Sequence, residues 1–399
     1  MSVKVYKKFR ITQNDFHREI GEEYMLPVLL SFGLLFGILG VLSPRFRTFF
    51  GSLLFFVMFL TMVFNNGNVD YDSYVRNFNN SDFEHENLFS YIEFLSKSIG
   101  LTYSEFFIAV MAISMILIFV TLRRLNVNLS SFYLLYFLYP FCLDVVQVRN
   151  FFACAIVFYS LPWLLINDKR HKIYYIVGVL IASGIHTISL VYLLILLYEV
   201  IKNSKSLKII FSVTVFLLIV FTLNVGRLGS YLIFLQTQMY NLLNETRVYE
   251  MSLDDVGERG YIIFYSVHFM NLLLLHLCNK DFDSRNQEYR KTVHTKCMIK
   301  DGIRAKQYIE IVMWINIVLT IFIPLYRFQA TLFRITRNLM IINYSGLLVY
   351  NQFSINNGKK RIINVAYIAL VVFLFYFEIV RGDNSIRIFK PILVNNWLN

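Results

Sequence analysis

The chain has 399 residues, of which 57% are hydrophobic, 17% are aromatic and only 16% are charged. A soluble core of this size cannot bury so much apolar surface, so the composition excludes an ordinary soluble domain and indicates a polytopic membrane protein. The formal net charge of +12 does not indicate nucleic-acid binding, because the basic residues sit in short loops between apolar segments, as in membrane topology signals.

Apolar segments of bilayer length recur along the chain and predict an all-α fold with about 11–12 transmembrane helices. They form a single transmembrane domain over residues 24–380, between an N-terminal tail (1–23) and a C-terminal tail (381–399). The expected spans are 24–42, 48–64, 103–122, 129–146, 150–166, the two halves of 173–200, 209–225, 261–277, 307–325, 339–353 and 362–380.

Segment 173–200 is long for one span, and basic residues flank both of its ends. If both ends are cytoplasmic, the chain must turn back at Ser183-Gly184-Ile185-His186, where Gly and Ser favour a helix break. We therefore expect a short hairpin with His186 near its outer tip.

Counting the hairpin as two crossings places 21 of the 38 Lys and Arg residues in the cytoplasm and 12 outside, where the long loops are 65–102, 226–260 and 326–338. The other five lie in the N-terminal tail, which this scheme places outside, against the positive-inside rule. The outer set comprises ten Arg and two Lys, whereas the cytoplasmic set comprises nine Arg and twelve Lys. This preference for guanidinium indicates bidentate recognition of phosphate or carboxylate. Headgroup anchoring explains a single outer arginine equally well, but it fits less well for Arg149, Arg327 and Arg334, which abut apolar spans.

The first outer loop concentrates acids, tyrosines and asparagines. Such side chains hydrogen-bond sugar hydroxyls and stack on sugar rings, and a carboxylate among them would act as a base toward a hydroxyl nucleophile. The candidate site residues are Asp70, which is also the candidate base, with Tyr71, Asp72, Tyr74, Arg76 and Glu86. The alternative is an interfacial loop whose aromatic residues belong to the membrane belt.

The corner between the fourth and fifth spans places Arg149 beside a membrane segment, where a charge is costly unless it is used. Pro140 weakens the end of the preceding span, and Asn150 is a favoured N-cap for the next helix. Arg149 at a helix N-terminus, next to Gln147, predicts an anion site that suits a polyprenyl diphosphate in the outer leaflet. The alternative is an ion pair of Arg149 with Asp144 or with a lipid headgroup.

His186 and a late group of arginines supply the remaining candidates. His186 would take a proton from an attacking sugar hydroxyl or donate one to a leaving diphosphate, or it is a structural hydrogen-bonding residue. Arg327 and Arg334 are seven residues apart, which predicts one helical face, with Arg337 one turn further along. Stacked arginines at the outer end of a span suit a diphosphate or a chain of hydroxyls and carboxylates.

Neither a metal nor a cofactor is expected. The four cysteines are scattered without metal-ligand spacing, and they are interpreted as packing residues. The chain also lacks a Gly-rich nucleotide-binding loop of the Walker type.

These motifs, in this order, resemble the Wzy-type polysaccharide polymerases, and more closely the EpsG family of bacterial capsule and exopolysaccharide clusters. The matching motifs are Asp70-Tyr71-x-x-Tyr74-x-x-x-Phe78, Glu86 before Leu88-Phe89, Gln147-Val148-Arg149-Asn150-Phe151-Phe152-Ala153, Ala182-Ser183-Gly184-Ile185-His186, and a late arginine at Arg327 or Arg334. Two positions depart from the pattern, because Asn87 stands where the family often has Pro and Asn150 where it often has Gln.

The resemblance implies a multi-pass glycosyltransferase of GT-C-like character in the bacterial cytoplasmic membrane. It would transfer a growing glycan from undecaprenyl diphosphate to the nonreducing end of another lipid-linked repeat unit at the outer membrane face, with His186, Asp70 and Arg149 as catalytic candidates. The implied partners are the undecaprenyl-diphosphate-linked oligosaccharide, membrane lipids, and the flippase and chain-length regulator of the same pathway.

Three rival functions stay open at the level of sequence. A lipid-linked oligosaccharide flippase would also bind diphosphate through arginines, but it would be expected to show internal repeats. A membrane O-acyltransferase of surface glycan would use a histidine within a span but take its donor from the cytoplasm. A ligase that moves finished glycan to another acceptor uses the same chemistry and is not separable by sequence.

Overall fold

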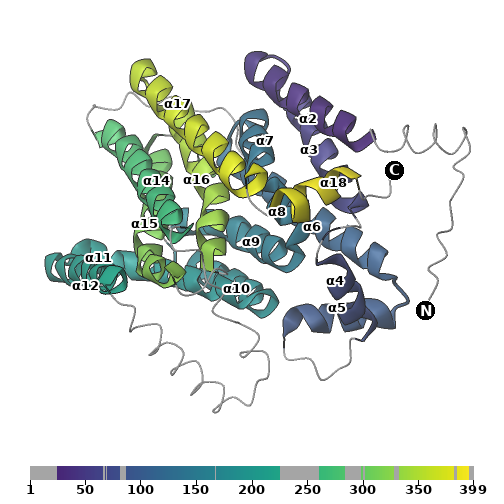
Figure 1. Ribbon diagram of the computed structural model, residues 1–399. Helices are drawn as coiled ribbons and strands as arrows, with labels where there is room; N and C mark the ends of the chain where they lie inside the picture. The colour runs from purple at the N-terminus through teal and green to yellow at the C-terminus, as the bar shows by residue number, and fades with distance from the viewer. Residues whose placement is uncertain are drawn as a thin grey trace, which may run out of the picture.

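The computed structural model describes residues 25–65, 68, 70–80, 87–166, 168–224, 260–283, 298–299, 302–327, 332–381 and 384–394. Helices dominate these ranges, and none of the described segments forms a strand. The helices pack side by side in one bundle, with shorter helices at its edges (Figure 1). The all-α prediction is therefore confirmed.

The first half of the chain contains long membrane-type helices and short helices between them. The elements are α2 (Met25–Leu42), α3 (Arg47–Phe64), α4 (Tyr71–Asn79), α5 (Leu88–Ser98), α6 (Tyr103–Leu125), α7 (Leu129–Leu138), α8 (Phe141–Val146), α9 (Val148–Ser160) and η1 (Leu161–Leu165). The predicted outer loop 65–102 thus contains two helices, α4 and α5.

The second half continues in the same way. Its elements are α10 (Lys169–Ile185), η2 (Thr187–Leu197), α11 (Tyr198–Asn203), α12 (Lys205–Asn224), α14 (Gly260–Asp283), α15 (Gly302–Leu319), η4 (Thr320–Arg327), α16 (Phe333–Phe353), α17 (Asn357–Leu374), η6 (Phe375–Val380), η7 (Ser385–Phe389) and α18 (Lys390–Val394). Of the predicted outer loop 226–260, residues 226–259 lie outside the described residues.

Six helical segments in the described ranges are long and apolar enough to cross a membrane by themselves. They are Arg47–Phe64, Tyr103–Leu125, Val148–Leu165, Tyr261–Phe282, Gly302–Ile323 and Asn357–Val380, and three shorter apolar helices accompany them, Pro27–Leu42, Leu129–Leu138 and Thr187–Leu197. Large apolar side chains also stay exposed on outward faces, for example Phe32 of α2, Leu180 of α10 and Val365 of α17. Lipid tails are as apolar as these side chains, so the exposed faces are those of an integral membrane protein.

Helix α16 is the central element of the bundle. Every residue from Ile335 to Tyr350 is buried, and the helix packs against α7, α9, α14 and α15. Figure 1 shows it running through the middle of the molecule. Because its sides are packed, the side chains of its first turns are held in fixed positions.

Two of the predicted spans contain breaks. The segment 129–146 is not one helix, because it divides into α7 and α8 at Tyr139-Pro140, where proline lacks the N–H that a continuous helix needs. The segment 173–200 breaks at His186, between α10 and η2, as predicted. The Tyr175 hydroxyl donates to the Tyr192 carbonyl at 2.8 Å, so the chain does turn back on itself.

Gly184 has a steric role beside this break. A Cβ atom at this position would lie 2.9 Å from the Cβ of Leu88, closer than side chains normally approach. The glycine therefore lets the end of α10 approach the start of α5, which brings the hairpin tip next to the first outer loop.

Candidate functional site

A cavity of about 720 Å³ lies where the first outer loop, the corner before α9 and the hairpin tip meet the start of α16. Seven of the residues predicted from sequence line it: Asp70, Tyr74, Gln147, Arg149, Asn150, His186 and Arg334. These residues come from segments far apart in the chain, so the fold gathers them. Among the described residues, His, Cys, Asp and Glu form no group of three or more that would hold a metal ion.

Five helices of the described part begin at this cavity. Their N-cap residues all line it, namely Asp70 of α4, Asn87 of α5, Gln147 of α9, His186 of η2 and Leu332 of α16. The first turn of a helix leaves backbone N–H groups without intrahelical partners and carries partial positive charge. The N–H groups of these first turns favour an anionic ligand, and the carbonyl ends of two helices meet them there, because the C-cap of α8 is Gln147 and that of α10 is His186.

Helix α4 is amphipathic and turns its polar face to the cavity. The lining residues Asp70, Ser73, Tyr74 and Asn77 follow the i, i+3, i+4, i+7 spacing of one helical face. On another face, the Tyr71 and Phe78 rings contact the Tyr103 ring, with centroids 5.5 and 5.8 Å apart. Tyr71 thus packs against α6 instead of lining the cavity.

The other candidates of the first outer loop have different locations. Asp72 and Arg76 are exposed and lie outside the cavity lining. Glu86 lies outside the described residues. Asn87, next to it, caps α5 by accepting a hydrogen bond from the Ser90 backbone N–H at 2.9 Å.

Asp70 has the environment of a base. Its backbone N–H donates to the Asn68 side chain at 3.0 Å, whereas its own carboxylate makes no capping hydrogen bond to α4 in the described segment. Burial raises the pKa of the Asp70 carboxyl above its usual value, and the positive charge of Arg334 opposes the rise. A carboxylate with a raised pKa binds a proton more readily than an exposed aspartate does.

Arg149 lies in the first turn of α9 and is held by aromatic rings. Its guanidinium carbon is 5.5 Å from the centroid of the Tyr74 ring and 4.9 Å from that of Phe89, in cation–π contact. No carboxylate of the described residues lies within 4.0 Å of the guanidinium. The alternative partner Asp144 instead accepts from the Tyr136 hydroxyl at 3.0 Å. Arg149 is thus fixed in place while its charge stays available to a ligand.

Arg334, in the first turn of α16, contacts the histidine of the hairpin tip. Its Nη1 is 3.2 Å from Nε2 of His186. A guanidinium can only donate, so His186 Nε2 is the acceptor, which makes the ring neutral with its proton on Nδ1. That Nδ1 atom is buried and has no partner among the described residues.

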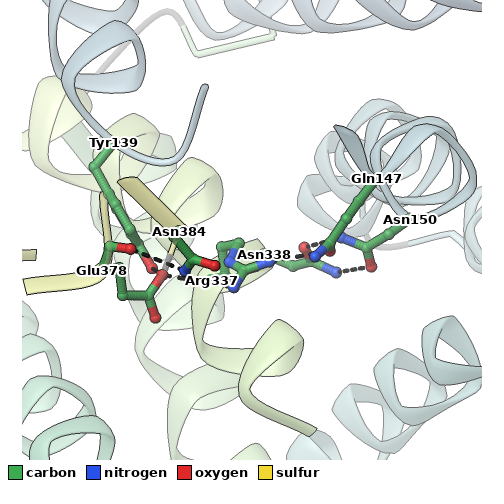
Figure 2. Close-up of polar contacts among 7 residues, drawn as sticks. All are labelled: Tyr139, Gln147, Asn150, Arg337, Asn338, Glu378 and Asn384. Atoms are coloured by element: carbon green, nitrogen blue, oxygen red, sulfur yellow. Dashed lines mark hydrogen bonds and ion pairs between the residues drawn. The ribbon is translucent and has the colours of Figure 1, made fainter. Parts of the chain in front are cut away.

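The next turn of α16 holds the corner before α9 at Gln147 and Asn150 (Figure 2). Arg337 donates from Nη1 to the Gln147 side-chain oxygen at 3.0 Å. Asn338 and Asn150 exchange two amide hydrogen bonds, each 2.9 Å long. Two adjacent residues of α16 therefore hold the corner on both sides of Arg149.

Glu378 of η6 forms an ion pair with Arg337, and neither residue lines the cavity (Figure 2). Its Oε2 lies 3.5 Å from Arg337 Nη2 and accepts from the Tyr139 hydroxyl at 3.0 Å. Asn384 also donates to the Glu378 carbonyl at 2.9 Å. The Arg337 side chain is only 9% exposed and that of Glu378 only 5%, so this is a buried ion pair. Arg337 therefore acts as a positioning residue for Gln147.

The structure corrects two predictions about this region. Asn150 is not the N-cap of α9, because the helix begins at Val148 with Gln147 as its N-cap. Arg327 and Arg334 do not share one helical face, because η4 ends at Arg327 and α16 begins at Phe333. Both predictions relied on local spacing, which does not show where a helix begins.

Sequence reasoning also missed residues that the structure places in or behind the cavity. Ser73 and Asn77 line it, and Glu378 and Asn338 support it. Glu378 could have been predicted from the sequence, because it is an acid within the apolar segment 362–380. An ionisable residue in such a segment is a functional candidate, by the same rule that selected Arg149. Asn338 carried none, because its partner lies 188 residues away in the chain.

Fold and site together define a class, an all-helical integral membrane protein with a cavity that is lined by two arginines, neutral polar groups and apolar side chains. The chain belongs to the EpsG family, whose family model matches residues 48–390. No curated protein and no solved structure matches the chain.

Proposed function

We propose that this protein is a polysaccharide polymerase. It transfers a growing glycan from undecaprenyl diphosphate to the nonreducing end of a second lipid-linked repeat unit, at the outer face of the bacterial cytoplasmic membrane. Membership of the EpsG family supports the proposal. The observation that carries it is the cavity, where two guanidinium groups, neither with a carboxylate of the described residues within 4.0 Å, meet the starts of five helices.

A diphosphate fits the charges of this cavity. Arg149 and Arg334 both line it, and the backbone N–H groups of the first helical turns add positive potential. Fixed donors of this kind bind phosphate oxygens strongly and stabilise the negative charge that grows on a departing diphosphate. Their main contribution therefore comes in the transition state, which is where it increases the rate.

The proposed transfer joins the two substrates in one displacement. The acceptor hydroxyl oxygen bonds to the anomeric carbon of the donor sugar, and the bond from that carbon to the diphosphate oxygen breaks. The electron pair of this bond stays on the polyprenyl diphosphate. Asp70 takes the proton of the hydroxyl and later releases it to water.

Asp70 suits the role of base better than His186 does. The His186 Nε2 lone pair already accepts a hydrogen bond from Arg334, and the other ring nitrogen carries the proton. His186 therefore orients the guanidinium of Arg334, whereas the Asp70 carboxylate faces the cavity without a capping bond in the described segment. The partners that go with this function are membrane lipids, the flippase that delivers the repeat units and the regulator of chain length.

Arg149 offers the most direct test. In cells whose own copy of the gene is replaced, Arg149→Ala and Arg149→Lys should both abolish long-chain glycan, because a lysine lacks the bidentate guanidinium. Single repeat units should still reach the cell surface on lipid, which separates a polymerase from a flippase. The readout is the ladder of surface glycan on a gel.

Arg76→Lys provides the matched control, because Arg76 is exposed on α4 and lies outside the cavity lining. This variant should keep the full ladder. A normal ladder from both Arg149 variants would overturn the assignment of the diphosphate to this cavity, and a loss of surface repeat units would favour the flippase.

A further inference from the structure

The lining of the cavity includes two groups of residues of different chemistry on different elements, which we call the polar wall and the apolar wall. The polar wall consists of Asp70, Ser73 and Asn77 of α4 with Asn87 before α5. The apolar wall consists of Ile188 and Val191 of η2, Phe322 of η4 and Leu332 before α16. Figure 1 shows α4 and α5 at one side of the bundle, apart from α15 and α16.

The apolar wall suits a hydrocarbon. Ile188 and Val191 are three residues apart on a 3₁₀-helix, a spacing that places both side chains on the same face. Covering apolar surface stabilises a complex by about 25 cal/mol per Å². A sugar against this wall would instead lose hydrogen bonds from its hydroxyls to water without replacement.

The polar wall suits a saccharide. Ser and Asn side chains both donate and accept hydrogen bonds, as sugar hydroxyls do. Ser73 and Asn77 are neutral and stand on the same face of α4 as Asp70. A hydroxyl bound to them therefore lies within reach of the proposed base.

The positions of Arg149 and Arg334 indicate which substrate binds to each wall. In a donor, the prenyl chain is joined directly to the diphosphate, so it must lie beside the site of Arg149 and Arg334. In an acceptor, the reacting hydroxyl is at the nonreducing end, a whole repeat unit away from its own lipid. Only the donor therefore brings hydrocarbon close to the cationic groups.

We propose that the first isoprenoid units of the donor lie on the apolar wall and that the acceptor saccharide binds to the polar wall. This inference rests on the proposed function, because it presumes a diphosphate at the two arginines. It predicts that the protein recognises its donor partly through the hydrocarbon chain.

Two ligands that share an anionic head test the apolar wall. Affinities of farnesyl diphosphate and inorganic pyrophosphate are measured on the full-length protein in detergent. Farnesyl diphosphate should bind at least about tenfold more tightly, because its chain adds buried apolar area. Val191→Asn should remove most of this difference and leave the pyrophosphate affinity unchanged, which also shows that the variant is folded. The control is Leu190→Asn, because Leu190 is 50% exposed and outside the lining.

Failure of this inference is distinguishable from failure of the proposed function. Equal affinity of wild-type protein for both ligands, or a Val191→Asn variant that retains the difference, would overturn the assignment of the apolar wall and leave the anion site intact. A variant that weakens both ligands equally would overturn it too. If neither ligand binds wild-type protein, the proposed function itself fails.

The polar wall is tested by steady-state transfer between defined lipid-linked oligosaccharides. The double variant Ser73→Ala/Asn77→Ala should raise KM for the acceptor about tenfold, because two hydrogen-bonding groups are lost. KM for the donor should not change. The control is Asn79→Ala at the end of α4, outside the lining. A change in KM for the donor instead of the acceptor, or no change in either, would overturn the assignment of the polar wall.

Discussion

Arg334 and Arg337 stand one turn apart on α16, and their surroundings differ in kind. Arg334 lines the cavity and donates to the neutral ring of His186. Arg337 lies behind the cavity, where it pairs with Glu378 and donates to Gln147. Two identical side chains at one end of one helix therefore have different environments, because Arg337 has a charged partner and Arg334 faces the cavity.

His268 and His186 differ in the same way. His268 lies within the continuous helix α14, is 1% exposed, and its Nε2 is 3.0 Å from both the Asn316 carbonyl and the Thr320 hydroxyl. His186 lies at a helix break and lines the cavity. The set of partners, more than the residue type, separates the scaffold of this protein from its candidate site.

The largest effect is expected where the ion pair behind the cavity is broken. Glu378→Ala leaves the charge of Arg337 buried without its partner, which should lower the free energy of unfolding by about 3–5 kcal/mol. Thermal unfolding of the purified protein measures this. The double variant Glu378→Gln/Arg337→Gln should be more stable than Glu378→Ala, because it removes both charges together. Wild-type stability of Glu378→Ala would remove the contrast between the two arginines.

Arg334→Gln should lower the rate of the reaction and leave the stability of the protein nearly unchanged, the converse of Glu378→Ala. In the proposed reaction the transfer rate should fall about 10²–10³-fold, because the variant loses a hydrogen-bond donor that would stabilise the leaving diphosphate. The free energy of unfolding should change by less than about 1 kcal/mol, since no ion pair is broken in the described part of the chain. Arg76→Gln is the matched control for both measurements. A destabilisation as large as that of Glu378→Ala, with little change in rate, would reverse the assignment.

A smaller effect concerns pH. Burial raises the pKa of the Asp70 carboxyl and the charge of Arg334 opposes the rise. A base must be deprotonated, so kcat/KM should increase as the pH rises through this pKa and decrease below it. Arg334→Gln removes the opposing charge, so the acidic limb of its residual activity should move to higher pH.

The exposed neighbour Asp72 provides the control for this profile. Asp72→Asn should leave the acidic limb at the wild-type position. An acidic limb that stays in place or moves to lower pH in Arg334→Gln would show that Asp70 is not the group that titrates.

Much of the fold was predictable because membrane-spanning segments are encoded locally. Hydrophobic length gave the positions of α2, α3 and α6 within a few residues. The break at His186 was also local, since Ser, Gly and flanking basic residues all favour a turn there. The corner of Arg149 stood out because a charge beside an apolar segment needs an explanation.

The remainder depended on contacts across the chain. The pairing of Asn150 with Asn338 spans 188 residues, and that of Tyr139 with Glu378 spans 239. No local pattern encodes such a partner, so sequence alone could not separate Arg337 from Arg334. The predicted start of α9 and the predicted common helix of Arg327 and Arg334 were wrong for a related reason. Tertiary packing decides whether a turn continues as helix.

The convergence of five helix starts on one cavity has a consequence for substitutions at its lining. The backbone N–H groups at these starts stay in place when a side chain is replaced. Replacing Ser73 or Asn77 should therefore change the side-chain chemistry of the lining and keep those backbone donors.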